Sequence, residues 1–380
     1  MNEVILKELW LHSVCGYEPE CVSAVLSVFQ STENSFGIRT KESAEIKKLG
    51  LPGKFLKEYS DEKHLIMANK LLEYCDKKGI RIITMESAEY PVCLKNVYLP
   101  PRVLFAIGKR IDLENTVNVS VVGSRKATDK GLVAAERIGA NLAQNGITVV
   151  SGMAEGIDAA AMNGALKAGG TVIAVLAGGV EEIYPKSNKG LYYRTLENGM
   201  VISERPPGTK VKRYFYQQRN RIIVGLSNGV VIAEGELKSG TAITARLATD
   251  NNRDVFAVPG SPTVSQAKLP NLLIYDGAAI IDRMERPADY YRDIYPDKVG
   301  VRDVEKVQSR ENKGITGLND EDLKIIEILK ENGGAATVEM IAERCKIQVN
   351  RINARITILG IKGVIKQESG NRVLLICDIG

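Results

Sequence analysis

The chain has 380 residues, of which 44% are hydrophobic and 26% charged, a composition typical of a globular protein with two or three domains. The net charge of +5 permits a nucleic-acid partner without requiring one. The chain has only two histidines, which disfavours a histidine-rich metal site and a histidine-based catalytic triad. Its six cysteines lack zinc-finger or Cys-x-x-Cys spacing, so we expect them to be buried thiols in a protein of the reducing cytosol. The N-terminus does not resemble a signal peptide and no apolar run is long enough to span a bilayer, so we expect a soluble, cytoplasmic protein without membrane contact.

Residues 1–80 are predicted to form a small helical module. Apolar residues recur from Leu65 to Cys75 at three- and four-residue spacing, until Gly79 ends the helix. Earlier helical stretches are short and separated by glycine turns.

Residues 81–283 are predicted to form a Rossmann-like core with a doubly wound parallel sheet. Strand-like runs such as "VNVSVVG", "ITVVSG", "TVIAVLAGG", "GVVIAEG" and "DVFAVPG" alternate with helices predicted at 129–145, 156–168 and 241–250. Continuous valine and isoleucine runs are typical of parallel strands that are covered on both faces.

The rest of the chain is predicted to contain a linker and a winged helix. Residues 284–316 are charged and irregular, which favours a linker. Residues 317–380 show three helical stretches followed by a hairpin around Ser369-Gly370-Asn371, the pattern of a winged helix. Its third helix carries Arg351 and Arg355, and Lys362 and Lys366 follow, so the unit could bind either duplex DNA or protein.

Glycine and serine turns follow the predicted core strands. Ligands of open parallel sheets bind beyond the carboxyl ends of the strands. At the first of these ends, Gly123 permits a tight turn, Ser124 can donate to a phosphate, and Arg125 offers a planar set of donors. Later ends add Lys186 and the helix start Ser239-Gly240-Thr241. Each turn alone is compatible with a structural role, but together they predict a rim of amides suited to phosphates or nucleotides.

Two common phosphate motifs are absent. G-x-G-x-x-G does not follow the first core strand, which disfavours an ordinary NAD site. The P-loop pattern G-x-x-x-x-G-K-S/T occurs nowhere, so nucleotide hydrolysis is not expected.

Residues 210–221, "KVKRYFYQQRNR", are the densest basic and aromatic cluster. Cations for phosphates, interleaved with aromatic platforms for bases, are what single-stranded nucleic acid requires. The candidate contacts are Lys212, Phe215, Arg219, Asn220 and Arg221. One alternative is a charged loop in which Arg219 and Arg221 pair with Glu204 or Glu234. Another places Phe215 in the core beneath an "IIVGLS" strand.

These motifs together resemble the DNA-processing protein A family, DprA or Smf. The matches run in order: "GSR", "SGMAEGID", "YPKSN", "ISERPPG", "FYQQRNRIIVGLS", "SGTAITA", "VFAVPG" and "NLLIYDGA". The resemblance implies a sterile-alpha-motif-like N-terminal module and a homodimer that binds single-stranded DNA and loads RecA recombinase onto it in natural transformation. It implies no catalysis and no cofactor. It also implies that the Gly-Ser-Arg turn and Lys212 hold DNA phosphates while Phe215 stacks on a base.

Some positions depart from the family pattern. Glu155 stands where the family usually has Arg, Met162 where it has His, Tyr216 where it has Pro, and Leu269-Pro270 where it has Gly-Cys. The change at Glu155 reverses a charge beside the expected crevice. A rival hypothesis is a nucleotide-binding protein or a phosphoribohydrolase of nucleoside monophosphates, although no Glu follows Thr241 in the matching place.

Overall fold

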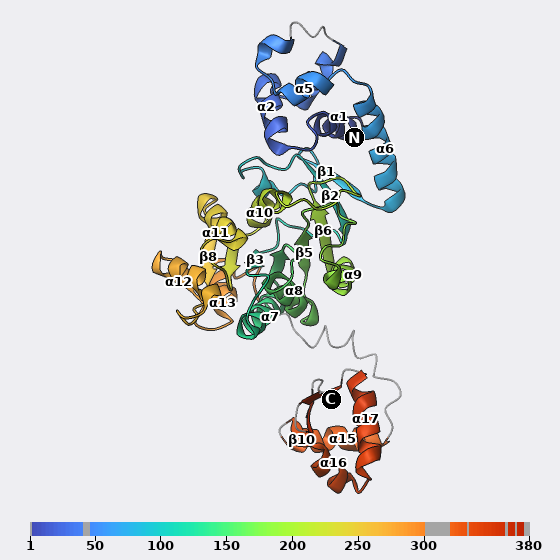
Figure 1. Ribbon diagram of the computed structural model, residues 1–380, viewed down its shortest axis with the longest axis vertical. Coiled ribbons are helices and arrows are strands. Elements are labelled where there is room, and N and C mark those ends of the chain that lie inside the picture. The colour runs from blue at the N-terminus through green and yellow to red at the C-terminus, as the bar shows by residue number, and fades with distance from the viewer. Residues whose placement is uncertain are drawn as a thin grey trace. The chain divides into compact units, whose positions relative to one another are not determined.

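The computed structural model describes residues 2–40, 46–300, 320–332, 334–361, 364–368 and 371–375. The chain divides into two compact units, Met1–Arg302 and Asp303–Gly380 (Figure 1). Within the described residues, no helix has both the length and the apolar character needed to cross a bilayer.

The first unit begins with a helical module. Its helices are α1 (Asn2–Val14), α2 (Pro19–Phe29), α3 (Thr32–Gly37), α5 (Gly53–Glu58) and α6 (Lys63–Lys78), with short 3-10 turns at Ile38–Thr40 and Lys47–Leu49. The fully buried Trp10 packs edge-on against Phe36 and Phe55 at the centre of the module. Gly79 ends α6 in the left-handed conformation, as its position after the apolar pattern predicts.

A nine-stranded sheet follows. Its strands are β1 (Arg81–Thr84), β2 (Val103–Gly108), β3 (Asn118–Val122), β4 (Thr148–Ser151), β5 (Val172–Val175), β6 (Gly199–Ser203), β7 (Gly229–Ile232), β8 (Asp254–Ala257) and β9 (Ala279–Ile280). The order is β1-β2-β6-β5-β4-β3-β7-β8-β9, and the strands from β6 to β9 in this list are parallel. Strands β1 and β2 extend the sheet in antiparallel pairings. The winding direction reverses between β3 and β7, which makes that junction the switch point of the fold.

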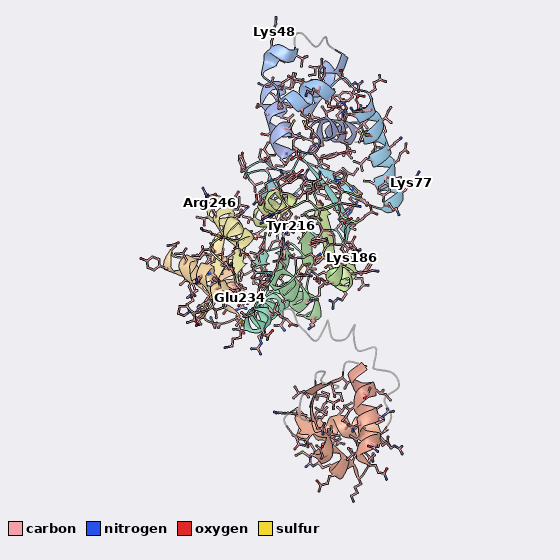
Figure 2. All side chains as sticks on the ribbon, in the orientation of Figure 1. Lys48, Lys77, Lys186, Tyr216, Glu234 and Arg246 are labelled. Atoms are coloured by element: carbon pink, nitrogen blue, oxygen red, sulfur yellow. The ribbon has the colours of Figure 1, made fainter. Side chains whose placement is uncertain are left out.

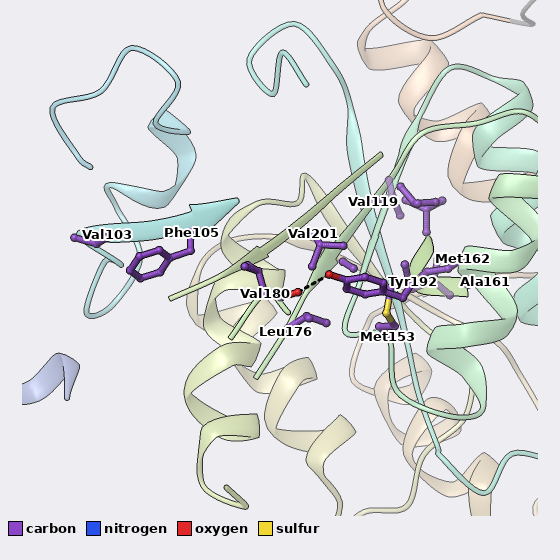
Figure 3. Close-up of a cluster of buried hydrophobic side chains, with 14 of the residues drawn as sticks. Val103, Phe105, Val119, Met153, Ala161, Met162, Leu176, Val180, Tyr192 and Val201 are labelled. Atoms are coloured by element: carbon purple, nitrogen blue, oxygen red, sulfur yellow. Dashed lines mark hydrogen bonds between the residues drawn. The ribbon is translucent and has the colours of Figure 1, made fainter. Parts of the chain in front are cut away.

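Helices cover both faces of the sheet. They are α7 (Asp129–Gln144), α8 (Ile157–Lys167), α9 (Lys189–Asn198), α10 (Phe215–Gly225), α11 (Gly240–Asp250), α12 (Lys268–Tyr275) and α13 (Arg286–Ile294), with 3-10 turns at Val92–Leu94, Lys186–Asn188 and Ser265–Ala267. Because side chains alternate along a strand, Val121 of β3 packs in one core with Ile138 of α7, while Val122 packs in the other with Ile222 of α10. Figure 3 shows part of the first core, where the Tyr192 hydroxyl donates to the Val180 carbonyl at 2.8 Å. The Rossmann-like α/β fold predicted from the sequence is confirmed.

Two sequence-based predictions in this unit are wrong. The apolar run "IIVGLS" is not a strand, because residues 222–225 are the last turn of α10. The expected linker does not begin at 284, because α13 packs on the core, where Tyr291 is 1% exposed and donates to Asp254 at 2.9 Å. Residues 301–316 of the predicted linker lie outside the described residues.

The second unit contains α15 (Asp320–Glu331), β10 (Ala335–Thr337), α16 (Val338–Cys345), α17 (Val349–Ile361), β11 (Ile365–Glu368) and β12 (Arg372–Leu375). Its strands form a three-stranded antiparallel sheet in the order β10-β12-β11. The three helices lie at the expected positions. Ser369 and Gly370 of the predicted hairpin turn lie outside the described residues, and the winged-helix assignment stays a prediction.

Candidate nucleic-acid interface

A cleft of about 400 Å³ lies at the switch point of the sheet. The turn after β3, residues 123–126, forms one wall, and the segment after β7 with the first turn of α11 forms another. Helix α10 contributes Tyr216, Arg219 and Asn220. The topology therefore brings together strand ends that lie far apart in the sequence, as expected for an open parallel sheet.

The Gly123-Ser124-Arg125 turn is fixed by close packing. A β-carbon on Gly123 would lie 2.6 Å from Ile157 Cγ1 and 2.7 Å from the Glu234 carbonyl oxygen, so only glycine fits. Gly156 adopts a φ of +78°, and a β-carbon there would lie 2.3 Å from the Ser124 carbonyl oxygen. The Ser124 amide donates to the Glu234 carbonyl at 2.8 Å, so this amide is engaged within the protein.

Glu234 has a structural role beneath this turn. Its carboxylate accepts from the backbone amide of Thr128 at 2.9 Å and from the Thr128 hydroxyl at 2.6 Å. Thr128 in turn caps α7 by accepting from the Gly131 amide. Glu234, labelled in Figure 2, is thus engaged at the start of α7 and pairs with neither Arg219 nor Arg221.

Six exposed cations occupy the turn after β3, the loop after β5 and the segment before α10. They are Arg125, Lys126, Lys186, Lys210, Lys212 and Arg213. Within the part of the chain that the structure describes, none of them forms a salt bridge with a carboxylate. Arg125 and Lys126 line the cleft, whereas Lys186 lies outside its lining on the turn Lys186–Asn188 (Figure 2). Cations without carboxylate partners are available for phosphate oxygens.

Arg219 and Arg221 are buried instead. Arg219 donates to the carbonyls of Gly152, at 2.8 Å, and Val175, so it ties the ends of β4 and β5 together beneath the cleft. Burial lowers the pKa of the Arg219 guanidinium to about 10, an effect that Asp158 opposes, and burial also raises the pKa of Asp158.

Arg221 lies outside the cleft lining and pairs with Glu204 at 2.6 Å. This buried pair holds the Arg221 guanidinium inside the protein, so the structure lends no support to its predicted DNA contact, which stays a prediction. The alternative of a pair with Glu204 is confirmed, although the surrounding segment is a helix and not a charged loop.

Phe215 is also placed differently from the expectation. It begins α10, is 4% exposed, and lies under the Arg205 guanidinium, whose Cζ is 4.0 Å from the ring centroid. A buried ring has no free face for a base, so in this conformation Phe215 belongs to the core.

The neighbouring Tyr216 faces the cleft instead. The Arg125 Cζ lies 4.4 Å from its ring centroid, which is cation–π distance, and burial raises the pKa of the Tyr216 phenol. Arg125 and Tyr216 therefore form one surface that combines an exposed cation with an aromatic ring. Sequence reasoning missed Tyr216, although it lies in the same basic and aromatic cluster.

The remaining predicted residues lie at the start of α11 or beside it. Ser239, Gly240 and Thr241 line the cleft. The Ser239 hydroxyl caps α11 by accepting from the Ala242 amide at 3.3 Å. The Asn220 side chain donates to Thr244 at 2.9 Å and so joins α10 to α11. The first-turn amides of α11 face the cleft as potential anion donors.

The structure shows where two of the residues that depart from the family pattern, Glu155 and Met162, are located. Glu155 is exposed and accepts from the Ser187 hydroxyl at 2.9 Å, next to Lys186, so its negative charge lies beside the cationic rim. Met162, on α8, is fully buried in the core (Figure 3).

The second unit offers fewer free cations than its sequence indicates. Arg351 pairs with Glu321 at 2.6 Å, and Arg355 pairs with the buried Asp322. Both arginines stabilise the packing of α17 on α15. Lys362 lies outside the described residues, as does the side chain of Lys366.

Known proteins share this architecture. A family model described as "DNA recombination-mediator protein A" matches residues 81–292, more than half of the chain. The chain belongs to this family. The match covers the nine-stranded sheet and the cleft at its switch point, so the DprA/Smf resemblance read from the motifs is confirmed.

Individual DprA relatives align over most of the chain or of its core. The Smf protein of Synechocystis is 35% identical over 277 residues, which cover 72% of this chain and 69% of that protein. DprA of Bacillus subtilis is 40% identical over 54% of this chain and 69% of its own length. The crystal structure of DprA from Streptococcus pneumoniae superposes with a TM-score of 0.62 at 30% identity and covers 74% of this chain and 95% of that one. A structure of Helicobacter pylori DprA that concerns its single-stranded DNA binding mode has a TM-score of 0.51 at 26% identity and covers 57% and 97%.

Proposed function

We propose that this DprA-family chain binds single-stranded DNA in the switch-point cleft. The observation that carries the proposal is the surface of Arg125 and Tyr216, which places an exposed cation against an aromatic ring inside the cleft. Backbone phosphates bind cations and unstacked bases stack on aromatic rings, so one nucleotide can satisfy both groups. The structure of Helicobacter pylori DprA, which addresses single-stranded DNA binding, supports single-stranded DNA as the ligand.

The strand would follow the exposed cations beyond the cleft. Lys126 and Arg125 lie at the turn after β3, and Lys210, Lys212 and Arg213 precede α10. Binding of this kind depends on phosphates more than on base edges, so it has little sequence preference. The logarithm of the affinity falls with the logarithm of the salt concentration, with a slope of about 0.7 per phosphate neutralised.

A fluorescence anisotropy titration tests the proposal directly. A labelled oligothymidylate, its duplex form and a mononucleotide are titrated at several salt concentrations. We expect the single strand to bind most tightly, with a clear salt slope. Equal or tighter binding of the duplex, or an affinity that does not change with the salt concentration, would refute the proposal. A mononucleotide that competes at the affinity of the oligonucleotide would favour a nucleotide-binding protein instead.

We propose that the chain acts by binding and carries out no catalysis. Two carboxylates line the cleft, and both have structural partners: Asp158 accepts from the amides of Gly152 and Ala154, and Glu236 accepts from the Ser265 hydroxyl at 3.4 Å. This arrangement gives no support to the phosphoribohydrolase alternative. Release of free base from a nucleoside monophosphate, or ATP turnover stimulated by DNA, would contradict this part of the proposal.

We further propose that the bound strand is passed to a RecA-type recombinase. The description of the family as recombination mediators supports this step. A suitable assay measures RecA ATPase activity on single-stranded DNA coated with a single-strand-binding protein, with and without this chain. We expect a shorter lag before RecA assembles. An unchanged lag at saturating DNA binding would refute the mediator role while leaving DNA binding intact.

A homodimer through the open edge of the sheet is the last part of the proposal. Among the residues that the structure describes, strand β9 pairs on one side only, and Ile280 of β9 is exposed, as are Leu272 and Tyr275 of α12. An open edge strand can pair with its own copy about a two-fold axis, which makes the surface self-complementary. Light scattering of the double variant Leu272→Asp, Tyr275→Asp should report a monomer, whereas the matched exposed-tyrosine control Tyr98→Asp should stay dimeric. A dimeric double variant would place the interface elsewhere.

A further inference from the structure

A second cavity, of about 280 Å³, lies between the helical module and the sheet. Helices α1 and α2 form one side of it, and the other side comes from the connection between β1 and β2 and from Glu204, which directly follows β6. None of its lining residues lines the switch-point cleft, so the two cavities are separate.

The walls of this second cavity are mostly apolar. The apolar residues that line it are Pro19, Val22, Leu26, Met85, Leu99 and Pro100. A smaller cavity of about 150 Å³, lined by leucine, isoleucine and phenylalanine, is large enough to bind benzene. The cavity between the helical module and the sheet therefore has room for a molecule with two fused rings.

The charged side chains that line this cavity are already paired. Arg102 Nη2 donates to the buried Glu8 carboxylate at 2.5 Å. Both carboxylate oxygens of Glu204 accept from Arg221 Nη2 at 2.6 Å. A charged ligand would lose its hydration shell here without gaining a partner of opposite charge, which is costly. The cavity therefore favours a neutral molecule.

His12 supplies one free hydrogen-bond acceptor. Its Nδ1 lies 2.8 Å from the Glu8 carbonyl oxygen, which can only accept, so Nδ1 carries the proton. Burial lowers the pKa of His12, which keeps the imidazole neutral and leaves a lone pair on Nε2. In the described part of the chain Nε2 has no hydrogen-bond partner, and each unpartnered side-chain nitrogen that is sealed from solvent belongs to a tryptophan or an arginine. Nε2 is therefore accessible in the cavity that His12 lines.

The backbone of Leu99 is strained beside this cavity. Its φ of +51° is in the left-handed region, which leucine rarely adopts, and the proline that follows restricts Leu99 further. The turn leaves Tyr98 74% exposed while Leu99 forms part of the cavity wall. Strained residues of this kind occur often at ligand-binding sites, where the surrounding structure holds them in place.

We propose that this cavity binds a small, neutral, mostly apolar organic molecule whose single hydrogen-bond donor is accepted by His12 Nε2. The apolar walls exclude a strongly polar ligand, and the paired charges exclude an ionic one. Such a ligand contacts both the helical module and the connection between β1 and β2, so its binding stabilises the folded chain. The proposal does not depend on DNA binding, because the switch-point cleft shares none of these residues.

Three probes of related shape test the chemical class of the ligand on the full chain. Indole is neutral and has one N–H donor, benzofuran has the same two rings with oxygen in place of the N–H, and indole-3-acetate carries a negative charge. Isothermal titration calorimetry measures the affinities, and scanning fluorimetry measures the melting temperature. We expect indole to bind with a dissociation constant of about a millimolar and to raise the melting temperature. Benzofuran should bind about two- to tenfold more weakly, the contribution of one hydrogen bond, and indole-3-acetate should not bind measurably.

Variants of the lining locate the bound probe. Ser23→Phe, at an exposed lining position on α2, adds a ring to the cavity and should abolish indole binding. Ser60→Phe, at an exposed position outside the lining, is the matched control and should bind indole like wild type. His12→Phe removes the acceptor and should make the affinities for indole and benzofuran equal. The melting temperature of each variant without ligand shows whether it is folded.

Three results would overturn the proposal. They are no indole binding at millimolar concentration, equal affinities of wild-type protein for indole and benzofuran, and undiminished indole binding by Ser23→Phe. Tight binding of indole-3-acetate would overturn the neutral class of ligand. If His12→Phe does not fold, the comparison of indole with benzofuran in wild type and the Ser23→Phe titration still decide the outcome.

Discussion

Phe215 and Tyr216 offer the sharpest test of how the cleft binds a strand. They are adjacent in the sequence, yet Phe215 is 4% exposed and Tyr216 lines the cleft. Truncating a buried phenylalanine to alanine costs about 3–5 kcal/mol. At roughly 2–4 °C per kcal/mol, Phe215→Ala should lower the melting temperature by about 10 °C. Tyr216→Ala removes a half-exposed ring and should leave the melting temperature nearly unchanged.

The DNA affinities should show the opposite order. Stacking of a base on an aromatic ring is worth about 1–3 kcal/mol, so Tyr216→Ala should weaken oligothymidylate binding between about fivefold and a hundredfold. Tyr216→Phe keeps the ring and serves as the matched control, with an affinity close to that of wild type. Differential scanning fluorimetry and anisotropy titrations give the two quantities for each variant. A stable Phe215→Ala protein that fails to bind, beside a Tyr216→Ala protein that binds normally, would refute the assignment.

Three further predictions concern charge. Arg125→Ala and Lys212→Ala should each reduce the salt slope of DNA binding by about 0.7 without lowering the melting temperature. The control Lys77→Ala, on α6, should leave the slope unchanged. An unchanged slope in the first two variants would show that the DNA strand does not contact these two cations. Glu155→Arg should raise both the affinity and the salt slope, since Glu155 lies beside Lys186; weaker binding in this variant would count against that path. Burial raises the pKa of the Tyr192 phenol to about 12, above its ordinary value near 10, so this group's stabilising contribution is complete below pH 10 and is lost as pH rises from 10 to 12. Urea unfolding of Tyr192→Phe should therefore show a smaller loss of stability over that window than wild type, and equal losses would contradict the shift.

The fold could be predicted from the sequence where burial on both faces leaves a clear pattern. Strands β3, β4, β5 and β7 are rich in valine and isoleucine, because each contributes side chains to the cores on both sides of the sheet. Helix α13 was missed because its sequence "RPADYYRDI" is mostly polar, and only Pro287, Ala288 and Tyr291 are buried.

The residues that line the cleft were predicted only in part, because the sequence does not show which way each side chain of a helix faces. Successive residues of a helix point about 100° apart, so the residue that begins α10 decides whether Phe215 or Tyr216 faces the ligand. Spacing alone carries no information about that choice. The role of an arginine is equally hard to predict from the sequence. Arg125, Arg219 and Arg221 have the same side chain, and only their tertiary contacts determine that Arg125 is exposed while the other two are buried.

The two margins of the sheet are unequal, and this sets a limit on assembly. On the β1 side, helices α1 and α6 contact the outermost strand. On the β9 side, no strand of the described residues pairs with the outer edge. A sheet with two open edges can pair with further copies at both edges and grow into a filament. A sheet with one open edge can pair with only one other copy. If the chain dimerises through β9 as proposed, the opposite edge lies next to the helical module, and the pairing would join two copies rather than a growing series.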